Sequence, residues 1–169
     1  MKRRIIGLFL AMNVLAFPAL AANIVQTAKS DGHFTKLLAA NETAGTAGLL
    51  QTKGPFTVFA PDDDAFAKVP AEKLAMLMKP ENATKLKVTL ANHVVTGLLT
   101  MAQIEGALDK ADAAVVMAAN TMPLIFKREG GVITVNGAHL KKPPMKVDNG
   151  IVYVIDTVMM PAMPIQPTY

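Results

Sequence analysis

The spacing of apolar residues divides the chain into an early helical part and a late strand-like part. From Asn23 to Leu50 the apolar side chains recur at near-helical intervals, interrupted by Asp31-Gly32 and by two later glycines. This pattern predicts short helices. Residues 56–60 then form a compact run of β-branched and aromatic side chains, which predicts a strand that ends at Pro61.

A second group of helices is predicted after this strand. Asp62 stands where a helix N-cap accepts a backbone hydrogen bond, and Asp63 and Asp64 follow where the first turn favours negative charge. The alternative, a calcium site, would need ligands at alternate positions, a glycine turn and a distant glutamate, and this run of three aspartates lacks that arrangement. Helical spacing continues over residues 71–78, 82–90 and 101–108.

Beyond Asn120 the apolar period changes to that of strands. Residues 124–126 and 132–135 flank Gly130-Gly131, and Asn136-Gly137 and Asn149-Gly150 are tight-turn signals between apolar runs. The pattern predicts an antiparallel meander. Residues 151–155 are apolar at every position, which predicts a central strand buried between two layers. Helices gathered early and strands gathered late indicate an α+β fold with segregated layers.

The first 21 residues have the three regions of a cleaved signal peptide. Lys2, Arg3 and Arg4 form a positive start, residues 5–17 are an apolar run with almost no polar interruption, and Ala19-Leu20-Ala21 is an Ala-x-Ala cleavage pattern. The alternative, a transmembrane anchor, needs about 20 apolar residues, and this run is shorter. We therefore expect a periplasmic or secreted protein with no transmembrane anchor after cleavage.

Removing this segment changes the charge balance. Of the 17 basic residues 14 remain, against 13 acidic ones, so the exported chain would be almost neutral. Without a basic stretch that carries aromatic residues, nucleic acid is not an expected partner. The chain has no cysteine, which excludes disulfides and thiolate metal sites. Its length suits one domain over residues 22–161, followed by a proline-containing tail over residues 162–169.

Three segments together resemble the fasciclin-like domain family. They are residues 57–66 (TVFAPDDDAF), 90–97 (LANHVVTG) and 149–161 (NGIVYVIDTVMMP), and they occur in the family's order and spacing. The resemblance covers about residues 23–161. It implies an α+β wedge of two β-sheets with helices packed at one side.

The resemblance also implies a function, which is adhesion or recognition of surface and matrix components without catalysis. Two pairs associated with receptor-mediated adhesion in animal members are not intact here. Asn92 stands in place of the tyrosine of a Tyr-His pair, and Pro144-Met145 stands in place of an Asp-Ile pair. The resemblance therefore supports a binding role but not an integrin-like partner. Its motif positions are interpreted as structural: Asp62, His93, Asn149, Gly150 and Asp156.

For the remaining candidate metal-binding and catalytic residues we favour a structural role. His93 lies beside two valines, where a buried imidazole bonded to the backbone is expected. The cluster Met159, Met160 and Met163 could bind Cu(I), but core packing is favoured. Ser30 is the one serine after the signal peptide and has no nucleophile context, so no enzyme activity and no cofactor are expected.

Two hypotheses follow for function. The first is an exported, non-catalytic binding module for an envelope or matrix protein or polysaccharide, with contacts on the loops at residues 98–110 and 141–148. In the second loop Lys141 and Lys142 would present charge. The second hypothesis is a periplasmic accessory protein that handles a small ligand or a metal.

Overall fold

The structure is a computed structural model that describes residues 22–141 and 143–161. The predicted signal peptide, the predicted tail with Met163, and Lys142 lie outside the described residues. In the part of the chain that is described, no helix has the length and apolar character needed to cross a bilayer.

Among the described residues, six α-helices occupy the regions where helical spacing predicts them, and the bounds of the last three agree with the prediction within one residue. Asn23 and Thr100 each close a capping box at the start of their helices, and Gly32, at φ 78°, ends the first one. The helices are α1 (Ile24–Asp31), α2 (Thr35–Thr43), α3 (Asp63–Ala67), α4 (Ala71–Leu77), α5 (Ala83–Ala91) and α6 (Met101–Leu108), with short 3-10 turns η1 (Leu49–Gln51) and η2 (Pro80–Asn82).

Eight strands form two four-stranded sheets, which confirms the predicted α+β class. Sheet A has the strand order β2-β1-β8-β7, and sheet B has the order β3-β4-β5-β6. The strands are β1 (Phe56–Pro61), β2 (Val94–Thr96), β3 (Ala113–Met117), β4 (Pro123–Glu129), β5 (Val132–Val135), β6 (Ala138–His139), β7 (Met145–Val147) and β8 (Gly150–Ile155).

The predicted meander is correct for sheet B and wrong for the end of the chain. Strands β3 to β6 pair antiparallel in sequence order. Beyond β6 the chain crosses to the other sheet, where β8 pairs antiparallel with β7 and parallel with β1. The reason is burial: β8 is apolar on both faces, and it is covered on both only in the middle of the molecule, beside the equally apolar β1.

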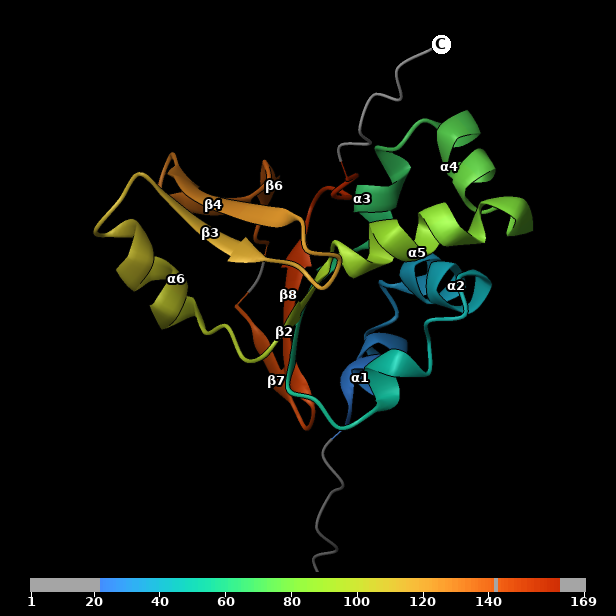
Figure 1. Cartoon of the computed structure of the whole chain (residues 1–169), viewed down its shortest axis with the longest axis horizontal. Helices are drawn as coiled ribbons and strands as arrows, with labels where there is room; N and C mark the ends of the chain where they lie inside the picture. Colours follow the sequence, from blue (N-terminus) through green and yellow to red (C-terminus); the bar gives the residue numbers. More distant parts are fainter. Residues whose placement is uncertain (1–21, 142, 162–169) are drawn as a thin grey trace, which may run out of the picture.

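Sheet A separates two apolar cores (Figure 1). Val152 and Val154 of β8 point toward helices α1 to α5, whereas Ile151, Tyr153 and Ile155 point toward sheet B. In the second core Phe59 stacks on Tyr153 with ring centroids 5.3 Å apart. The alternation of side chains along a strand thus explains why every residue of β8 is buried.

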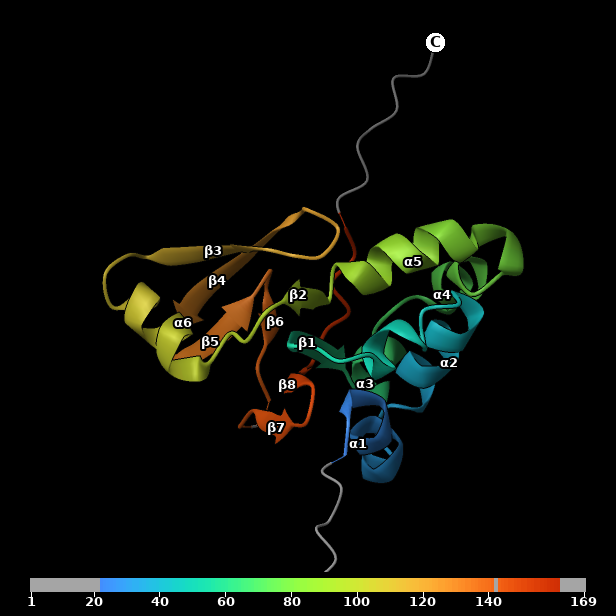
Figure 2. The ribbon, with the colours of Figure 1, turned by 60° about the horizontal axis from the view of Figure 1, so that its bottom comes forward.

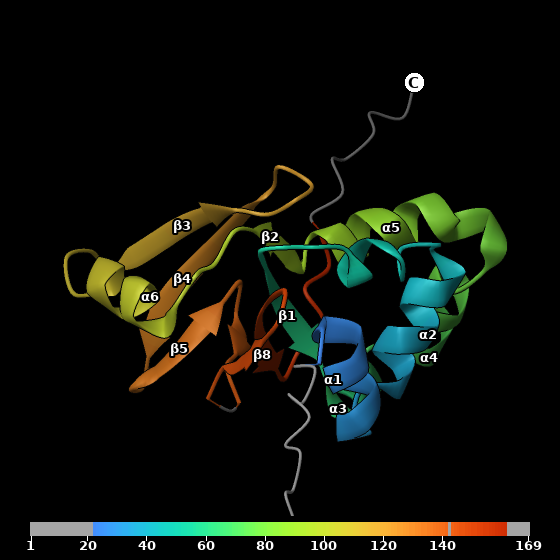
Figure 3. The ribbon, with the colours of Figure 1, turned by 90° about the horizontal axis from the view of Figure 1, so that it is seen from below.

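Helix α6 departs from the expectation that the helices pack at one side. Figures 2 and 3 show α1 to α5 together beyond sheet A, and α6 beside β3 on the side of sheet B. Ile104 and Leu108 of α6 are buried in the second core. The fold is therefore a helical layer, a central sheet and a second sheet with its own helix.

Candidate functional site

Asp62 caps the N-terminus of helix α3 and also binds a lysine that is distant in the sequence. Its Oδ1 accepts the amide of Ala65 at 2.9 Å, so it is the N-cap of α3 as its position predicts. Its Oδ2 accepts the Lys141 ammonium at 2.6 Å. The hydrogen bond from Lys141 to Asp62 raises the pKa of that lysine.

The sequence predicts that Lys141 presents its charge freely on a loop, whereas in the structure this charge is paired with Asp62. Its ammonium is held by Asp62, and its backbone amide donates to Val154 at 2.8 Å. The physical reason is that the segment after β6 returns along β8 and brings Lys141 to the acidic start of α3. Lys142, the second residue of the expected contact, is outside the described residues.

Asp156 is a second internal acceptor, just after β8. Its carboxylate accepts the His139 amide at 2.8 Å, the Thr157 hydroxyl at 3.0 Å and the Lys68 ammonium at 3.1 Å. Its Oδ2 also lies 3.2 Å from His139 Nδ1. Burial alone would raise the pKa of Asp156, but these hydrogen bonds outweigh it and lower the pKa to about 2.

His93 is buried, and both of its ring nitrogens are engaged. Nδ1 lies 2.8 Å from the carbonyl oxygen of Thr89, and Nε2 accepts the amide of Met159 at 3.0 Å. Nδ1 is therefore the protonated nitrogen of a neutral ring. Burial lowers the pKa of His93 to about 4, so the ring stays neutral at physiological pH. Neither nitrogen is available to a metal.

Asn149 connects three segments that are distant in sequence. Its Oδ1 accepts the amide of Ile24 at 3.0 Å, and its Nδ2 donates to the carbonyls of Leu50 at 2.8 Å and Thr52 at 3.0 Å. Its backbone carbonyl accepts the amide of Phe56. The residue after it must be glycine, because a Cβ at position 150 would overlap the carbonyl oxygen of Phe56. This motif position joins α1, η1 and β1.

Met159 and Asn92 are buried, and Met160, Pro144 and Met145 are half-buried. Met159 packs in the second core, and Met160 packs against the first, so their side chains diverge instead of converging on one ion. In the described residues no group of three or more His, Asp or Glu side chains could hold a metal. Asn92 is buried, with its Nδ2 donating to the carbonyl of Met159, so this position does not face a partner.

The two loops expected to make contacts meet at one hollow, which we call the open groove. It has a volume of about 790 Å³ and lies where the end of β7 faces the segment before α6. Leu98 and Thr100 come from the first loop, and Lys146 and Asp148 come from the second. Leu98 is 53% exposed and supplies an apolar side chain beside these polar groups. The other lining residues are Asn23, residues 51–55, Val147 and residues 149–151.

Only part of each expected loop reaches the open groove. Residues 101–108 of the first loop form α6, and Lys141 of the second loop is held at Asp62. The N-terminal end of the described chain also lies here, because the carbonyl of Ala22 accepts the amide of Asp148. The spacing of residues could identify the loops, but not which of their residues converge.

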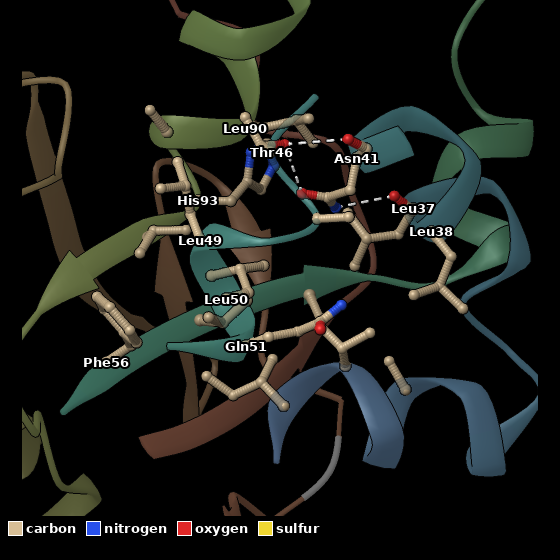
Figure 4. Close-up of a pocket in the computed structure, with 18 of the residues that line it drawn as sticks. Leu37, Leu38, Asn41, Thr46, Leu49, Leu50, Gln51, Phe56, Leu90 and His93 are labelled. Atoms are coloured by element: carbon tan, nitrogen blue, oxygen red, sulfur yellow. Dashed lines mark hydrogen bonds between the residues drawn. The ribbon is translucent and has the colours of Figure 1, made fainter. Parts of the chain in front are cut away.

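A separate hollow, the apolar cavity, lies in the helical layer and has a volume of about 300 Å³. Figure 4 shows Leu37, Leu50 and Phe56 around it, with hydrogen bonds joining Asn41 to Thr46 and to Leu37. Its apolar lining comes from α1, α2, η1, β1, α5, β2 and β8, and includes Ile24, Val25, Ala28, Leu38, Leu49, Val58, Leu90, Val94 and Val152. No single sequence motif marks this cavity, because its walls come from seven elements that are far apart in the sequence.

Comparison with known proteins places the chain in a family. The model of the Fasciclin domain matches residues 32–161. Protein sll1483 of Synechocystis is 38% identical over 143 residues, which cover 85% of this chain and 76% of that protein. The cell surface glycolipoprotein MPB83 of Mycobacterium bovis is 34% identical over 111 residues, which cover 64% of this chain and 44% of that protein.

A solved structure shows the same fold. The FAS1 domain pair from the insect cell adhesion molecule fasciclin I matches with a TM-score of 0.72 at 19% identity, over 82% of this chain and 50% of that one. At this identity the match concerns the fold alone. Together with the family model, which covers most of the described residues, it confirms the predicted family: the chain belongs to the fasciclin domain family.

Proposed function

We propose that this chain is an exported, non-catalytic binding module that recognises an envelope or matrix protein or polysaccharide. Membership of the fasciclin domain family carries the proposal. One relative is described as a cell surface glycolipoprotein, and the solved structure with the same fold comes from a protein described as a cell adhesion molecule. A binding role is consistent with both.

The open groove is the proposed recognition site. It gathers residues from both expected contact loops, and it combines an exposed apolar side chain, Leu98, with charged Lys146 and Asp148 at its edge. An apolar centre beside polar groups is typical of interfaces that bind macromolecules. Lys142 remains a proposed additional contact, whereas the Lys141 charge is engaged by Asp62.

Capture from the native cell envelope tests this proposal. The protein without its first 21 residues is immobilised, and the partner that it captures is purified and measured again for direct binding. We expect the double variant Leu98→Ser and Lys146→Glu to bind that partner at least tenfold more weakly, because it removes the apolar anchor and reverses a charge.

The matched control is Val132→Ser with Lys127→Glu. Val132 is 42% exposed and Lys127 is also exposed, but both lie in sheet B and neither lines the open groove. The control should bind like the unmodified protein. Equal binding by the Leu98 and Lys146 variant would show that the partner is recognised elsewhere, and Lys142→Glu would then test the remaining loop.

A further inference from the structure

We propose that the apolar cavity binds the hydrocarbon chain of a single-chain amphiphile with an anionic head group, such as a fatty acid of about twelve carbons. This inference goes beyond the proposed recognition of a macromolecule. It concerns a different hollow, which touches the open groove only through the shared residues Gln51 and Thr52.

The interior of the cavity suits a chain with no polar atoms. Asn41 donates to the carbonyl of Leu37 and accepts the hydroxyl of Thr46, so both polar ends of its amide are used. Both ring nitrogens of His93 are used as well. Water is held in a cavity only where it finds two to four polar partners, and these side chains have little left to offer. An apolar occupant is favoured instead.

The volume sets the length of the chain. An engineered cavity of about 150 Å³ accommodates benzene, which has six carbons. At about 300 Å³ the cavity therefore holds roughly twelve carbons on the same scale. That is one medium-length chain and not the two long chains of a bilayer lipid, so a free single-chain amphiphile is the proposed occupant.

The charge at the rim indicates the head group. Lys29 on α1 and Lys87 on α5 are exposed residues that contribute to the lining, together with one acidic residue, Glu42. Within residues 22–141 and 143–161 neither lysine forms a salt bridge with a protein carboxylate. Long lysine side chains can cover apolar surface while their ammonium groups stay in water. The excess of positive charge favours a carboxylate or sulfate at the end of the bound chain.

Binding of dodecanoate to the purified protein tests the proposal. Titration below the micelle concentration should give saturable one-to-one binding by calorimetry. In methyl NMR spectra the shifts should concentrate on Val25, Leu38, Leu49 and Leu50, which line the cavity. Dodecanol, which has no charge, should bind at least threefold more weakly than dodecanoate.

Two pairs of variants separate the chain from the head group. Ala47→Phe fills the cavity and should weaken dodecanoate binding at least tenfold, whereas Ala39→Phe, on the exposed face of α2, should not. Lys29→Glu with Lys87→Glu should weaken dodecanoate and strengthen dodecyltrimethylammonium, whereas Lys73→Glu with Lys85→Glu, outside the lining, should change neither.

Several results would overturn the proposal. They are the absence of saturable dodecanoate binding, binding unchanged by Ala47→Phe, and methyl shifts confined to Leu98 at the open groove. If circular dichroism shows that Ala47→Phe is unfolded, Leu38→Phe takes its place with the same expectation. Binding to phosphatidylglycerol vesicles without binding to dodecanoate would favour a membrane surface instead. The Leu98 and Lys146 variant should retain dodecanoate, so this proposal and the macromolecular one fail separately.

Discussion

Asp156 is a family-motif position with a structural role, because its carboxylate binds groups of the chain itself. Its carboxylate accepts hydrogen bonds from the His139 amide, the Lys68 ammonium and the Thr157 hydroxyl, and its side chain is 21% exposed. Because its pKa is about 2 in the folded protein and about 3.8 in the unfolded chain, the unfolded chain takes up the proton first on acidification. The stabilisation is therefore present above about pH 4 and is lost as the pH falls toward 2.

The variant Asp156→Asn tests this linkage. At pH 7 we expect its free energy of unfolding to be lower than that of the unmodified protein by on the order of 1 to 2 kcal/mol. The difference should shrink between pH 5 and pH 2, because the asparagine does not titrate. Urea unfolding across this range measures it, with the exposed Asp112→Asn as control. A difference that stays constant with pH would contradict the assigned role.

The hydrogen-bond partners of some residues could be predicted from the sequence, and those of others could not. The cap at Asp62 depends on an amide three residues away, and one bond of His93 depends on a carbonyl four residues away, so local pattern sufficed. The bond between Asp62 and Lys141 spans 79 positions. Nothing in the spacing of apolar residues indicates such a partner, so this ion pair cannot be predicted from the sequence.

At the scale of elements, Asn149 is the point where helix α1, the 3-10 turn η1 and the central strands β1 and β8 of sheet A are joined. Its amide makes three hydrogen bonds to backbone groups, and each would be left without this partner if the side chain were removed. The first turn of α1 and the end of η1 depend on it together. These segments also form part of the wall of the apolar cavity.

Asn149→Ala should therefore loosen these elements selectively. We expect the free energy of unfolding to fall by about 3 kcal/mol, since a largely buried side chain loses three backbone partners. Native-state hydrogen exchange should accelerate in α1 and η1 more than in α5. The control Asn82→Ala loses a single exposed hydrogen bond, to Met76, and should cost less than about 1 kcal/mol. Uniform acceleration over all helices would argue against a local joint.

Elements formed by neighbouring residues were predictable, and their long-range pairing was not. The β4–β5 hairpin turns at Gly130-Gly131, and α6 matches its helical spacing over residues 101–108. The parallel pairing of Phe56 with Gly150 joins strands that are separated by most of the domain. Short β2 and β6 carry too few residues for a period to be recognised. The open groove and the apolar cavity depend on these unpredicted neighbours.

At the scale of the whole molecule, sheet A is the shared wall of two cores. The apolar cavity lies against the first core, and the open groove touches the second core at Ile151. The N-terminal end of the described chain is attached to this body. Asn23 caps α1, and the carbonyl of Ala22 accepts the amide of Asp148. A cut before Ala22 would leave both contacts in place.

Export with cleavage after Ala21 is the expected processing of the chain. Mass spectrometry of the protein recovered from periplasm or medium should find Ala22 as the first residue. Replacing Ala19 and Ala21 with bulky leucines should leave an uncleaved form, because the cleavage pattern requires small residues. Replacing Ala22 alone serves as control. Full-length protein found in the cytoplasm would contradict the prediction.

The contact between Ala22 and Asp148 gives this processing a chemical consequence for the open groove. A newly formed amino terminus at Ala22 carries a positive charge, with an ordinary pKa near 8. The next residue, Asn23, already lines the open groove, together with Asp148. The expected cleavage would thus place an ammonium group beside the proposed recognition site, and a precursor that keeps its leader would lack this charge. Cleavage of the peptide bond before Ala22 would then change the charge at the open groove, and with it the ligands that the groove prefers.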